Sequence, residues 1–393
     1  MLQFSGFALG RGATAQTILL VSRTGALAYS SLLCVGSNPR AHIVLMAPRE
    51  LYHLRRSKYC AAFVCTPPGF FESTPEHAGG VLREAAEHYG ACRIVAADLD
   101  AVRLLSWSRE HIGIPCFPIP PPDVFETVNN KWRFYSFCVE AGLPVPRSSL
   151  VERFDDNSID RLFAEFPDRF VVKPLELDSS KGVVCIACRE DLRRLIFDNP
   201  AYPAGPWIAQ EFIDGDDVGV DLLAIDGSIV LQATQRRIMD ARVVEFFPCP
   251  QLVSAAGRFA AAIRFHGAAN IDARINARTG VAMLLECNPR PWGSIADALF
   301  CGMNFLDYDF MAPAPPRLLE SGLSITRLQP FQPELLWALA RRGSLRPAWR
   351  CAAALMTDPV ALLQMAKRSI RALRKDIGRC LRVATGSLAE DAR

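Results

Sequence analysis

The chain has 393 residues, of which 50% are hydrophobic and 22% charged, so it is long enough for two or three globular domains with a substantial core. Its net charge of +3 is too small to indicate a nucleic-acid partner, and no apolar run approaches the roughly 18 residues of a membrane-spanning helix. Thirteen scattered cysteines, without paired metal-ligand spacing, indicate small core residues of a reduced, cytoplasmic protein rather than a disulfide framework.

Strand-like and helix-like segments alternate in the first third of the chain. Residues 1–14 do not resemble a signal peptide, and we expect a short, loose leader there. The alternation that follows is typical of a parallel sheet flanked by helices. The bend after the first apolar run, SRTGALA, lacks the G-x-G-x-x-G fingerprint, which disfavours a dinucleotide-dependent dehydrogenase. The proline-dense segment 114–124 predicts an extended linker, so we place an α/β domain at 15–122.

The pattern changes in the next part of the chain, which we assign to a second domain at 123–312. Its apolar runs alternate less regularly with helices, and Asp226-Gly227 is a strong signal for a two-residue hairpin. We therefore predict an α+β domain with mostly antiparallel strands. Its expected strands are 170–174, 207–213, 218–225, 228–238, 268–275 and 281–288.

One hairpin of this domain carries candidate metal ligands. If the NARTG turn lies at its apex, Asp272 lies about opposite Glu286, and Asn288 shares the face of Glu286. Two carboxylates and an amide oxygen make an incomplete shell for Mg²⁺, which commonly adds water and phosphate oxygens. Read alone, LLECNPRPWGS is equally a strand end with a solvated acid before an Asn-Pro turn. Arg290 is placed to reach the same side and neutralise phosphate or a developing oxyanion.

Upstream segments offer a place for a nucleotide. Lys173 ends a strand and precedes a DSSKGV loop, whose small residues and Gly182 allow backbone amides to turn toward phosphate. The spacing of a P-loop is absent. QEFIDGDD then joins a strand to an acidic turn, where the backbone suits an adenine edge and Asp217 suits ribose hydroxyls. Each of these motifs alone is more often an ordinary part of a protein surface. Their order along the chain is what favours a nucleotide site.

In that order, Lys131, FVVKP, the Ser-Gly loop, QEFIDGDD, NIDARI and LLECNPRPWGS resemble the ATP-grasp superfamily. The last motif is particularly similar to the carboxylate–amine ligase-like branch, and the SKYC segment at 57–60 resembles a further motif of these proteins. The resemblance covers roughly 15–310. It implies a Rossmann-like pre-ATP-grasp domain, an ATP-grasp domain of two α+β subdomains that enclose ATP, and here a helical C-terminal region at 313–393.

The resemblance also implies roles for individual residues. Asp272, Glu286 and Asn288 match magnesium (or manganese) ligands, and Arg290 the arginine near the transferred phosphate. Either Arg236 or Arg237 matches an arginine that contacts substrate or phosphate, and we place Arg237 in the catalytic set with Arg290 and Lys173. The residues implied to contact ATP are Lys131, Lys173, Ser179, Ser180, Gly182, Gln210, Glu211, Phe212, Ile213 and Asp217.

The implied reaction is that of a ligase, in which ATP converts a carboxylate into an acylphosphate that an amine then attacks. Small-molecule carboxylates and amines are therefore the expected partners. Catalysis would be mainly electrostatic, which agrees with a sequence lacking a convincing Ser-His-Asp or Cys-His arrangement. Two alternatives stay open: an ATP-grasp kinase that transfers phosphate only, and a nucleotide-binding protein without activity.

The end of the chain is basic. Residues 340–382 contain eleven Lys or Arg against two Asp, and 359–382 has apolar residues at helical spacing with basic residues largely opposite. A terminal helix packed on its own domain is the favoured interpretation. The alternative is contact with an acidic partner or the inner membrane surface. A nucleic-acid partner is not expected, and the oligomeric state, a homodimer included, is left open.

Overall fold

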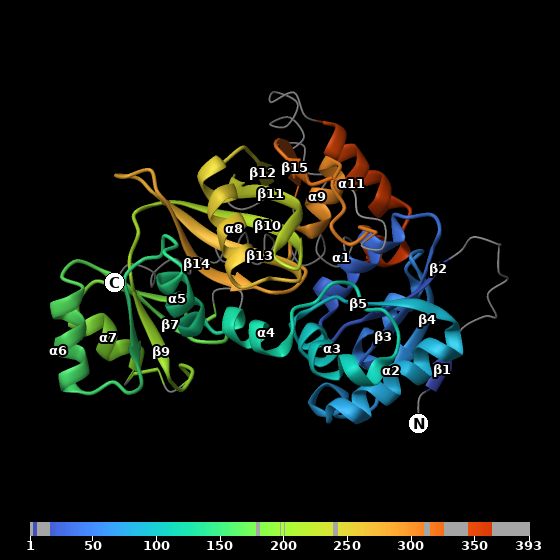
Figure 1. Cartoon of the computed structure of the whole chain (residues 1–393), viewed down its shortest axis with the longest axis horizontal. Helices are drawn as coiled ribbons and strands as arrows, with labels where there is room; N and C mark the ends of the chain where they lie inside the picture. Colours follow the sequence, from blue (N-terminus) through green and yellow to red (C-terminus); the bar gives the residue numbers. More distant parts are fainter. Residues whose placement is uncertain are drawn as a thin grey trace, which may run out of the picture.

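The computed structural model describes residues 3–5, 16–177, 181–196, 198–199, 201–238, 243–309, 315–325 and 345–363. The N-terminal domain lies at one end of the molecule and a small α+β subdomain at the other, with a larger antiparallel sheet between them (Figure 1). The predicted fold class is confirmed: an α/β domain precedes two α+β subdomains.

The N-terminal domain is built on a five-stranded sheet in the order β1-β4-β3-β2-β5. Strands β2 to β5 are parallel to one another, and their interiors are buried because helices cover both faces. The elements are β1 (Gln3–Ser5), β2 (Gln16–Val21), α1 (Gly25–Gly36), β3 (Ala41–Ala47), η1 (Arg49–Arg56), β4 (Cys60–Cys65), η2 (Phe70–Glu72), α2 (Pro75–Tyr89), β5 (Ala91–Ala96) and α3 (Leu99–Ile112).

The predicted loose leader needs correction at residues 3–5. These residues form β1, which pairs antiparallel with β4. Without it, β4 would be an edge strand with an unpaired row of backbone donors and acceptors. The leader therefore closes the edge of the first sheet.

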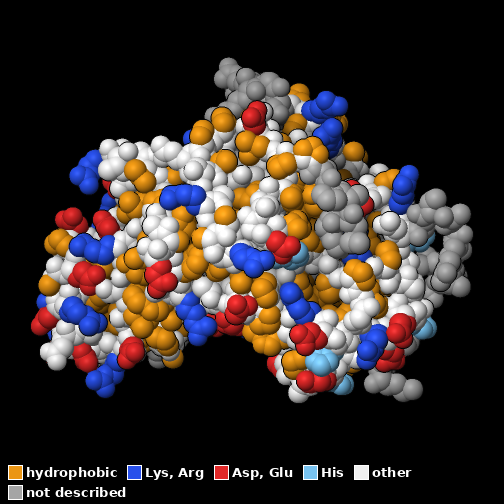
Figure 2. All heavy atoms as spheres, viewed as in Figure 1, with side chains coloured by type: hydrophobic (Ala, Val, Ile, Leu, Met, Phe, Trp, Pro, Cys, Tyr) orange, Lys and Arg blue, Asp and Glu red, His pale blue; other side chains and the backbone are white. Residues whose placement is uncertain are grey.

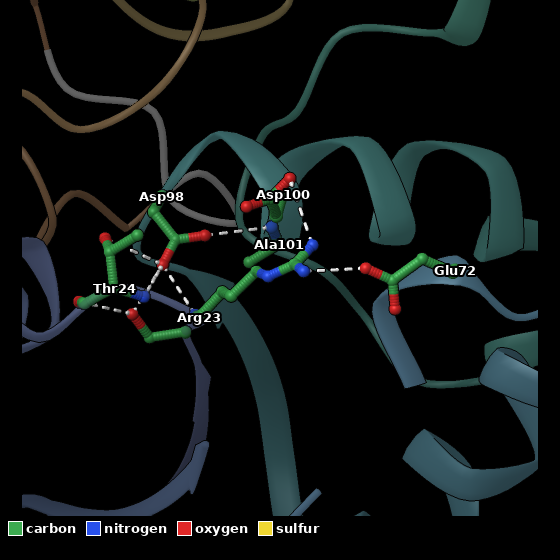
Figure 3. Close-up of polar contacts among 7 residues, drawn as sticks. Arg23, Thr24, Glu72, Asp98, Asp100 and Ala101 are labelled. Atoms are coloured by element: carbon green, nitrogen blue, oxygen red, sulfur yellow. Dashed lines mark hydrogen bonds and ion pairs between the residues drawn. The ribbon is translucent and has the colours of Figure 1, made fainter. Parts of the chain in front are cut away.

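Asp98 closes the point between β2 and β5, where a dinucleotide would bind in a Rossmann domain (Figure 3). Its Oδ2 accepts hydrogen bonds from Ser22 Oγ at 2.7 Å and from the backbone amides of Arg23 and Thr24 at 2.6 and 2.8 Å. Its Oδ1 accepts from the amide of Ala101 at 3.0 Å and so caps α3. The amides after β2 are thus used by the protein itself, which explains how this turn manages without the glycine fingerprint.

The proline-dense segment, which was predicted to be an extended linker, packs against the N-terminal domain. Phe117 and Ile119 are buried, and the amide of Phe117 donates to the carbonyl of Ile94 at 2.7 Å. A bridge from Cys116 to Ile94 continues the parallel sheet beyond β5. Prolines here remove donors at the edge of a sheet, where they are tolerated. The segment leads into α4 (Pro122–Asn129) and α5 (Lys131–Glu140).

The small subdomain contains a four-stranded antiparallel sheet in the order β6-β9-β7-β8. Its core centres on Phe166, Phe170 and Leu192. Cys185 and Cys188 are exposed, which corrects their interpretation as core residues. All cysteines in the described part of the chain are free thiols. Basic and acidic side chains intermingle over this subdomain in the view of Figure 2. Its elements are β6 (Ser148–Val151), α6 (Asp156–Glu165), β7 (Phe170–Pro174), β8 (Val184–Ile186), α7 (Arg189–Ile196) and β9 (Trp207–Glu211).

The large sheet has the order β14-β13-β10-β11-β12-β16, with β15 beside β11. The predicted Asp226-Gly227 hairpin is confirmed: both residues have positive φ, 47° and 88°, as a tight turn between β10 and β11 requires. Helix α8 packs on this sheet through Phe259, which contacts Phe134 of α5. The elements are β10 (Gly215–Ile225), β11 (Ser228–Ile238), β12 (Val243–Phe246), α8 (Pro250–Ala262), β13 (Gly267–Asn276) and β14 (Ala282–Asn288).

The region after 312 is less purely helical than predicted. It begins with β15 (Arg317–Leu319) and β16 (Gly322–Ile325), which extend the large sheet, so the boundary at 312 falls inside the ATP-grasp-like fold. Helix α11 (Arg346–Met356) packs against α9 (Ile295–Cys301), and Asp358 accepts a hydrogen bond from Ser57 of the SKYC segment at 2.5 Å. Residues 364–393, with most of the basic tail, lie outside the described part. Within that part, no helix is both long and apolar enough to span a membrane.

Candidate functional site

A large cleft, of about 1450 Å³, runs from the small subdomain past the β13–β14 hairpin to α1 and α9. This volume exceeds the roughly 300–1,000 Å³ of a typical small-molecule site, so there is room for a nucleotide together with a second ligand. All predicted site residues that are described line it, except Lys131 and Gly182.

The hairpin register of the candidate metal ligands is confirmed. Asp272 of β13 pairs with Glu286 of β14, and a one-residue shift between Asp272 and Ala273 makes the pairing possible. Without this bulge, Asp272 would face Leu285, whose side chain points to the other face of the strand. Asn288 lies two residues along, and its amide contacts Asp272 Oδ2 at 3.4 Å. The three oxygen-bearing side chains therefore lie together on one face.

Burial makes this carboxylate pair costly without positive charge. Burial and the like charge of Glu286 raise the pKa of Asp272 to about 7. Burial alone would raise the pKa of Glu286 too, but the charges of Lys131 and Lys173 outweigh it and lower that pKa. The described residues contain no group of three or more His, Cys, Asp or Glu side chains suited to a metal. A cation here would depend on Asp272, Glu286 and Asn288 plus ligands from a substrate, and such hard oxygen donors suit Mg²⁺.

Two buried lysines face the hairpin from neighbouring elements. Lys131 begins α5, where its Nζ lies 3.1 Å from Glu286 Oε2 and donates to the carbonyl of Leu177 at 2.6 Å. Lys173 on β7 donates to Gln210 Oε1 at 2.7 Å. Burial lowers the pKa of Lys173 to about 8, although Glu286 opposes this shift. Both ammonium groups are thus directed at the place where phosphate would meet the carboxylates.

The segments predicted to contact the rest of a nucleotide line the same cleft. Gln210 is buried and donates to Ser148 at 3.1 Å, while the amides of Glu211 and Phe212 donate to carbonyls of Arg147 and Arg169 and so fix this hinge. Ile213 is buried, and exposed Asp217 pairs with Arg274 at 3.1 Å, which leaves its outer oxygen open to a ribose.

Gly182 lies at the end of the loop predicted to cover phosphates. Its φ is +71°, and a Cβ at this position would lie 2.7 Å from Pro174, so only glycine fits without rearrangement. Its carbonyl accepts a hydrogen bond from Tyr202 at 2.8 Å, which ties this end of the loop to the small subdomain. Ser179 and Ser180 lie outside the described residues.

The structure distinguishes the two candidate arginines on β11. Arg236 forms an ion pair with Glu245 at 2.7 Å and lies over the Phe247 ring. Arg237 lines the cleft and makes no ion pair among the described residues, and its charge lowers the pKa of both Asp272 and Asp297. This placement favours Arg237. Arg290 is buried, with its guanidinium 3.4 Å from Asn288 Oδ1 and 3.1 Å from the carbonyl of Pro291.

A buried polar network beneath the site escaped the sequence analysis. Asp221 on β10 accepts hydrogen bonds from Asn270 at 2.9 Å and from Gln235 at 2.8 Å, and Gln235 in turn accepts one from Ser294 at 2.9 Å. The chain of contacts fixes the segment after Arg290 to the sheet. The strand alternation in VGVDLLAI places Asp221 on the same face as Gly219. This alternation is the one sequence feature that could have pointed to a polar side chain beneath the site.

Pro291-Trp292-Gly293 also gains an explanation. Trp292 is buried, packs edge-on against Phe305 at 4.9 Å between ring centroids, and accepts a hydrogen bond from the amide of Ile295 at 3.2 Å. The motif therefore anchors the start of α9 in the core. It holds α9 against the cleft.

Comparisons with known proteins agree with this architecture. Residues 204–313 match a family described as "ATP-grasp in the biosynthetic pathway with Ter operon". No curated protein matches the chain. The fold is similar to N5-carboxyaminoimidazole synthetase from Staphylococcus aureus complexed with ADP, with a TM-score of 0.61 and 14% identity over 84% of this chain and 87% of that one.

Two further solved structures are similar. Biotin carboxylase from Campylobacter jejuni gives a TM-score of 0.58 at 16% identity, over 74% of this chain and 69% of that one. L-amino acid ligase from Bacillus licheniformis gives 0.54 at 16%, over 75% and 73%. The chain thus has the ATP-grasp fold, and its residues 204–313 match an ATP-grasp family model.

Proposed function

We propose that the protein is an ATP- and Mg²⁺-dependent ligase that activates a carboxylate as an acylphosphate for attack by an amine. The observation that carries this proposal is the meeting of Asp272 and Glu286 with two buried lysines: Lys173 lines the same cleft, and Lys131 contacts Glu286 from beside it. The similar solved proteins, which include a ligase, a synthetase and a carboxylase, support it.

In this proposal ATP lies between β9 and the hairpin. Its adenine borders the Glu211–Ile213 hinge, its ribose borders Asp217, and its phosphates meet Lys131 and Lys173. Asp272, Glu286 and Asn288 would hold Mg²⁺, which when bound offsets the negative charge of the phosphates and polarises the γ-phosphoryl group. The lysines keep Glu286 ionised, as a metal ligand must be.

Arg290 and Arg237 suit the substrate side of the cleft. A guanidinium binds carboxylate or phosphoryl oxygens with two parallel hydrogen bonds, so either arginine can hold the attacking carboxylate in line and stabilise charge that develops during transfer. Arg290 is preorganised, because Asn288 and the carbonyl of Pro291 fix its guanidinium. The chemistry needs positioning and charge, and no side-chain nucleophile is involved.

Trapping with hydroxylamine tests the proposal. Purified protein with ATP, Mg²⁺ and a panel of amino acids and other small carboxylates should release ADP, and hydroxylamine should convert the acylphosphate to a hydroxamate. ADP release with formation of a stable phosphorylated product and no hydroxamate would instead identify a kinase. Nucleotide binding without ADP release across the panel would contradict both activities. Contact of the basic tail, 340–382, with an acidic partner or a membrane remains a separate prediction.

A further inference from the structure

The end of the cleft farthest from the small subdomain is chemically unlike the nucleotide side. Helices α1, α9 and α11 contribute its wall, through Leu27, Tyr29, Leu33, Asp297, Phe300 and Cys351. We call these residues the far chamber. Most of them are apolar, and the described part of the wall brings one carboxylate, that of Asp297, into this apolar setting. The far chamber is therefore shaped for a ligand with an apolar body and a specific polar group.

Asp297 is only 5% exposed and lies in the first turn of α9. Its Oδ1 accepts a hydrogen bond from Ser324 of β16 at 2.7 Å, the one side-chain donor to this carboxylate among the described residues. A carboxylate accepts about four hydrogen bonds when fully satisfied. Within the described residues, Asp297 therefore has fewer donors than Asp98, which accepts from the turn after β2 and from α3.

Thiols from three helices and one arginine lie near Asp297. Cys34 of α1, Cys301 of α9 and Cys351 of α11 lie near it, and its negative charge raises the pKa of each thiol, which adds to the effect of burial. Arg237 of β11 is near enough to lower the pKa of Asp297 but forms no ion pair with it. Burial dominates and raises that pKa to about 7. Among the described residues, Asp297 thus offers a carboxylate on the cleft wall with one side-chain donor, and a cation is the ligand group that complements it.

Tyr29 contributes ring surface to the wall of the chamber. Its side chain is 4% exposed. Its hydroxyl is inaccessible to solvent and lies near Asp358, so this residue adds apolar surface to the chamber and no polar group. Tyr29 and Asp297 approach the chamber from different domains, because α1 belongs to the N-terminal domain and α9 follows the hairpin.

We propose that the far chamber binds the amine substrate as its ammonium ion, with Asp297 as the carboxylate that holds the ammonium and the apolar walls around an apolar side chain. This inference rests on the proposed ligase function and names the class of its acceptor, an apolar primary amine or amino acid. Arg237, Asp272 and Asp297 line the same cleft, so the acceptor at Asp297 would share it with the activated carboxylate.

Formation of the C–N bond in this arrangement requires the ammonium to lose two protons and the acylphosphate to lose its phosphate. The ammonium must lose one proton to become a nucleophile, and Asp297, ionised above its pKa, accepts it. The amine nitrogen then attacks the acyl carbon, a C–N bond forms, and the bond from that carbon to the phosphate oxygen breaks. The second proton of the nitrogen leaves with the phosphate. No oxidant, reductant or further co-reactant is required.

Binding of isopentylammonium chloride, measured by calorimetry without ATP, tests the chamber independently of turnover. Wild-type protein should bind this probe, and Asp297→Asn should weaken binding about tenfold or more, because a charge-assisted hydrogen bond is lost. Wild-type affinity should rise between about pH 6 and about pH 8.5, since Asp297 ionises in that range while the amine, like lysine, stays protonated. Asp297→Asn should flatten this profile.

Asp156→Asn is the matched control, because Asp156 is also in the first turn of a helix but is exposed and outside the cleft. It should bind the probe like wild type. Equal affinity of wild type and Asp297→Asn, or no binding by wild type, would overturn the chamber assignment. Hydroxamate formation needs no bound ammonium, since hydroxylamine is largely uncharged at neutral pH. Asp297→Asn that still forms hydroxamate therefore separates failure at this subsite from failure of the proposed ligase function.

Discussion

Two groups of carboxylates in this molecule, one buried and one half-buried, have opposite environments. Asp98 in the N-terminal domain collects donors from the turn after β2 and from α3, so its charge is fully compensated within the protein (Figure 3). Asp272 and Glu286 on the hairpin face each other, and their nearest compensation is two lysines that themselves line or border a cleft. Both groups are shielded from water at least in part. They differ in whether donors of the protein alone compensate the carboxylate charge. The first arrangement stabilises a fold, and the second fits the proposed site for Mg²⁺ and phosphate.

Replacement of Glu286 should have the largest effect on activity. Glu286→Gln keeps the shape but removes the charge that a metal ligand needs, so ATP turnover should fall by about 10³-fold. Glu165→Gln is the matched control: Glu165 is partly buried and accepts a hydrogen bond from Ser149, but it lies outside the cleft. The thermal midpoint of Glu286→Gln should stay near that of wild type. Full turnover in this variant would show that the hairpin pair is structural, like Asp98.

Asp98→Ala should have the opposite effect to Glu286→Gln, lowering stability and leaving turnover unchanged. It leaves the buried hydroxyl of Ser22 and the amides of Arg23 and Thr24 without an acceptor, so the free energy of unfolding should fall by about 3 kcal/mol. Denaturant unfolding measures this change. Turnover per folded molecule should be close to wild type, because Asp98 does not line the cleft. Loss of turnover in the folded fraction would mean that this cluster serves the reaction after all.

Lys173 gives the cleft a pH dependence that the Asp98 cluster should not have. Its ammonium binds phosphate only when protonated, and burial has lowered its pKa to about 8. The kcat/KM for ATP should therefore decline as pH rises through about 8, since this parameter reports ionisation in the free enzyme. Lys173→Met should lower kcat/KM about 10²-fold and remove that limb. A limb that persists in Lys173→Met would assign it to another group.

The sequence predicted the functional face of the hairpin better than it predicted the edges of the domains. Strand alternation and a recognisable turn were enough to place Asp272 opposite Glu286, even though a bulge at Leu285 sets the final register. The ATP-grasp resemblance supplied Lys131 and Lys173, whose convergence depends on three separate segments. The strand alternation and the turn depend only on residues close together in the sequence, so they can be predicted without a structure.

Long-range features were less accessible. The pairing of residues 3–5 with β4, the packing of Phe117 beside β5 and the addition of β15 and β16 to the large sheet all join segments distant in sequence. Asp221 and Asp297 looked like ordinary acids, because nothing in a linear sequence shows which carboxylate is buried or which donors reach it. Such residues become visible only when tertiary contacts and burial are known.

The smallest expected effects lie within the Asp98 cluster itself and sharpen the contrast between burial and exposure. Ser22 is fully buried, so Ser22→Ala should cost about 1 kcal/mol of unfolding free energy through loss of its 2.7 Å hydrogen bond. Arg23 reaches Glu72 at 2.7 Å, but both side chains are substantially exposed, so Arg23→Gln should cost less than about 0.5 kcal/mol. Denaturant unfolding at low and high salt checks both. Added salt should shrink the effect of Arg23→Gln and leave that of Ser22→Ala unchanged, because only the exposed pair is screened. An equal or larger cost for Arg23→Gln would show that the surface ion pairs, rather than the buried hydrogen bonds, hold this turn.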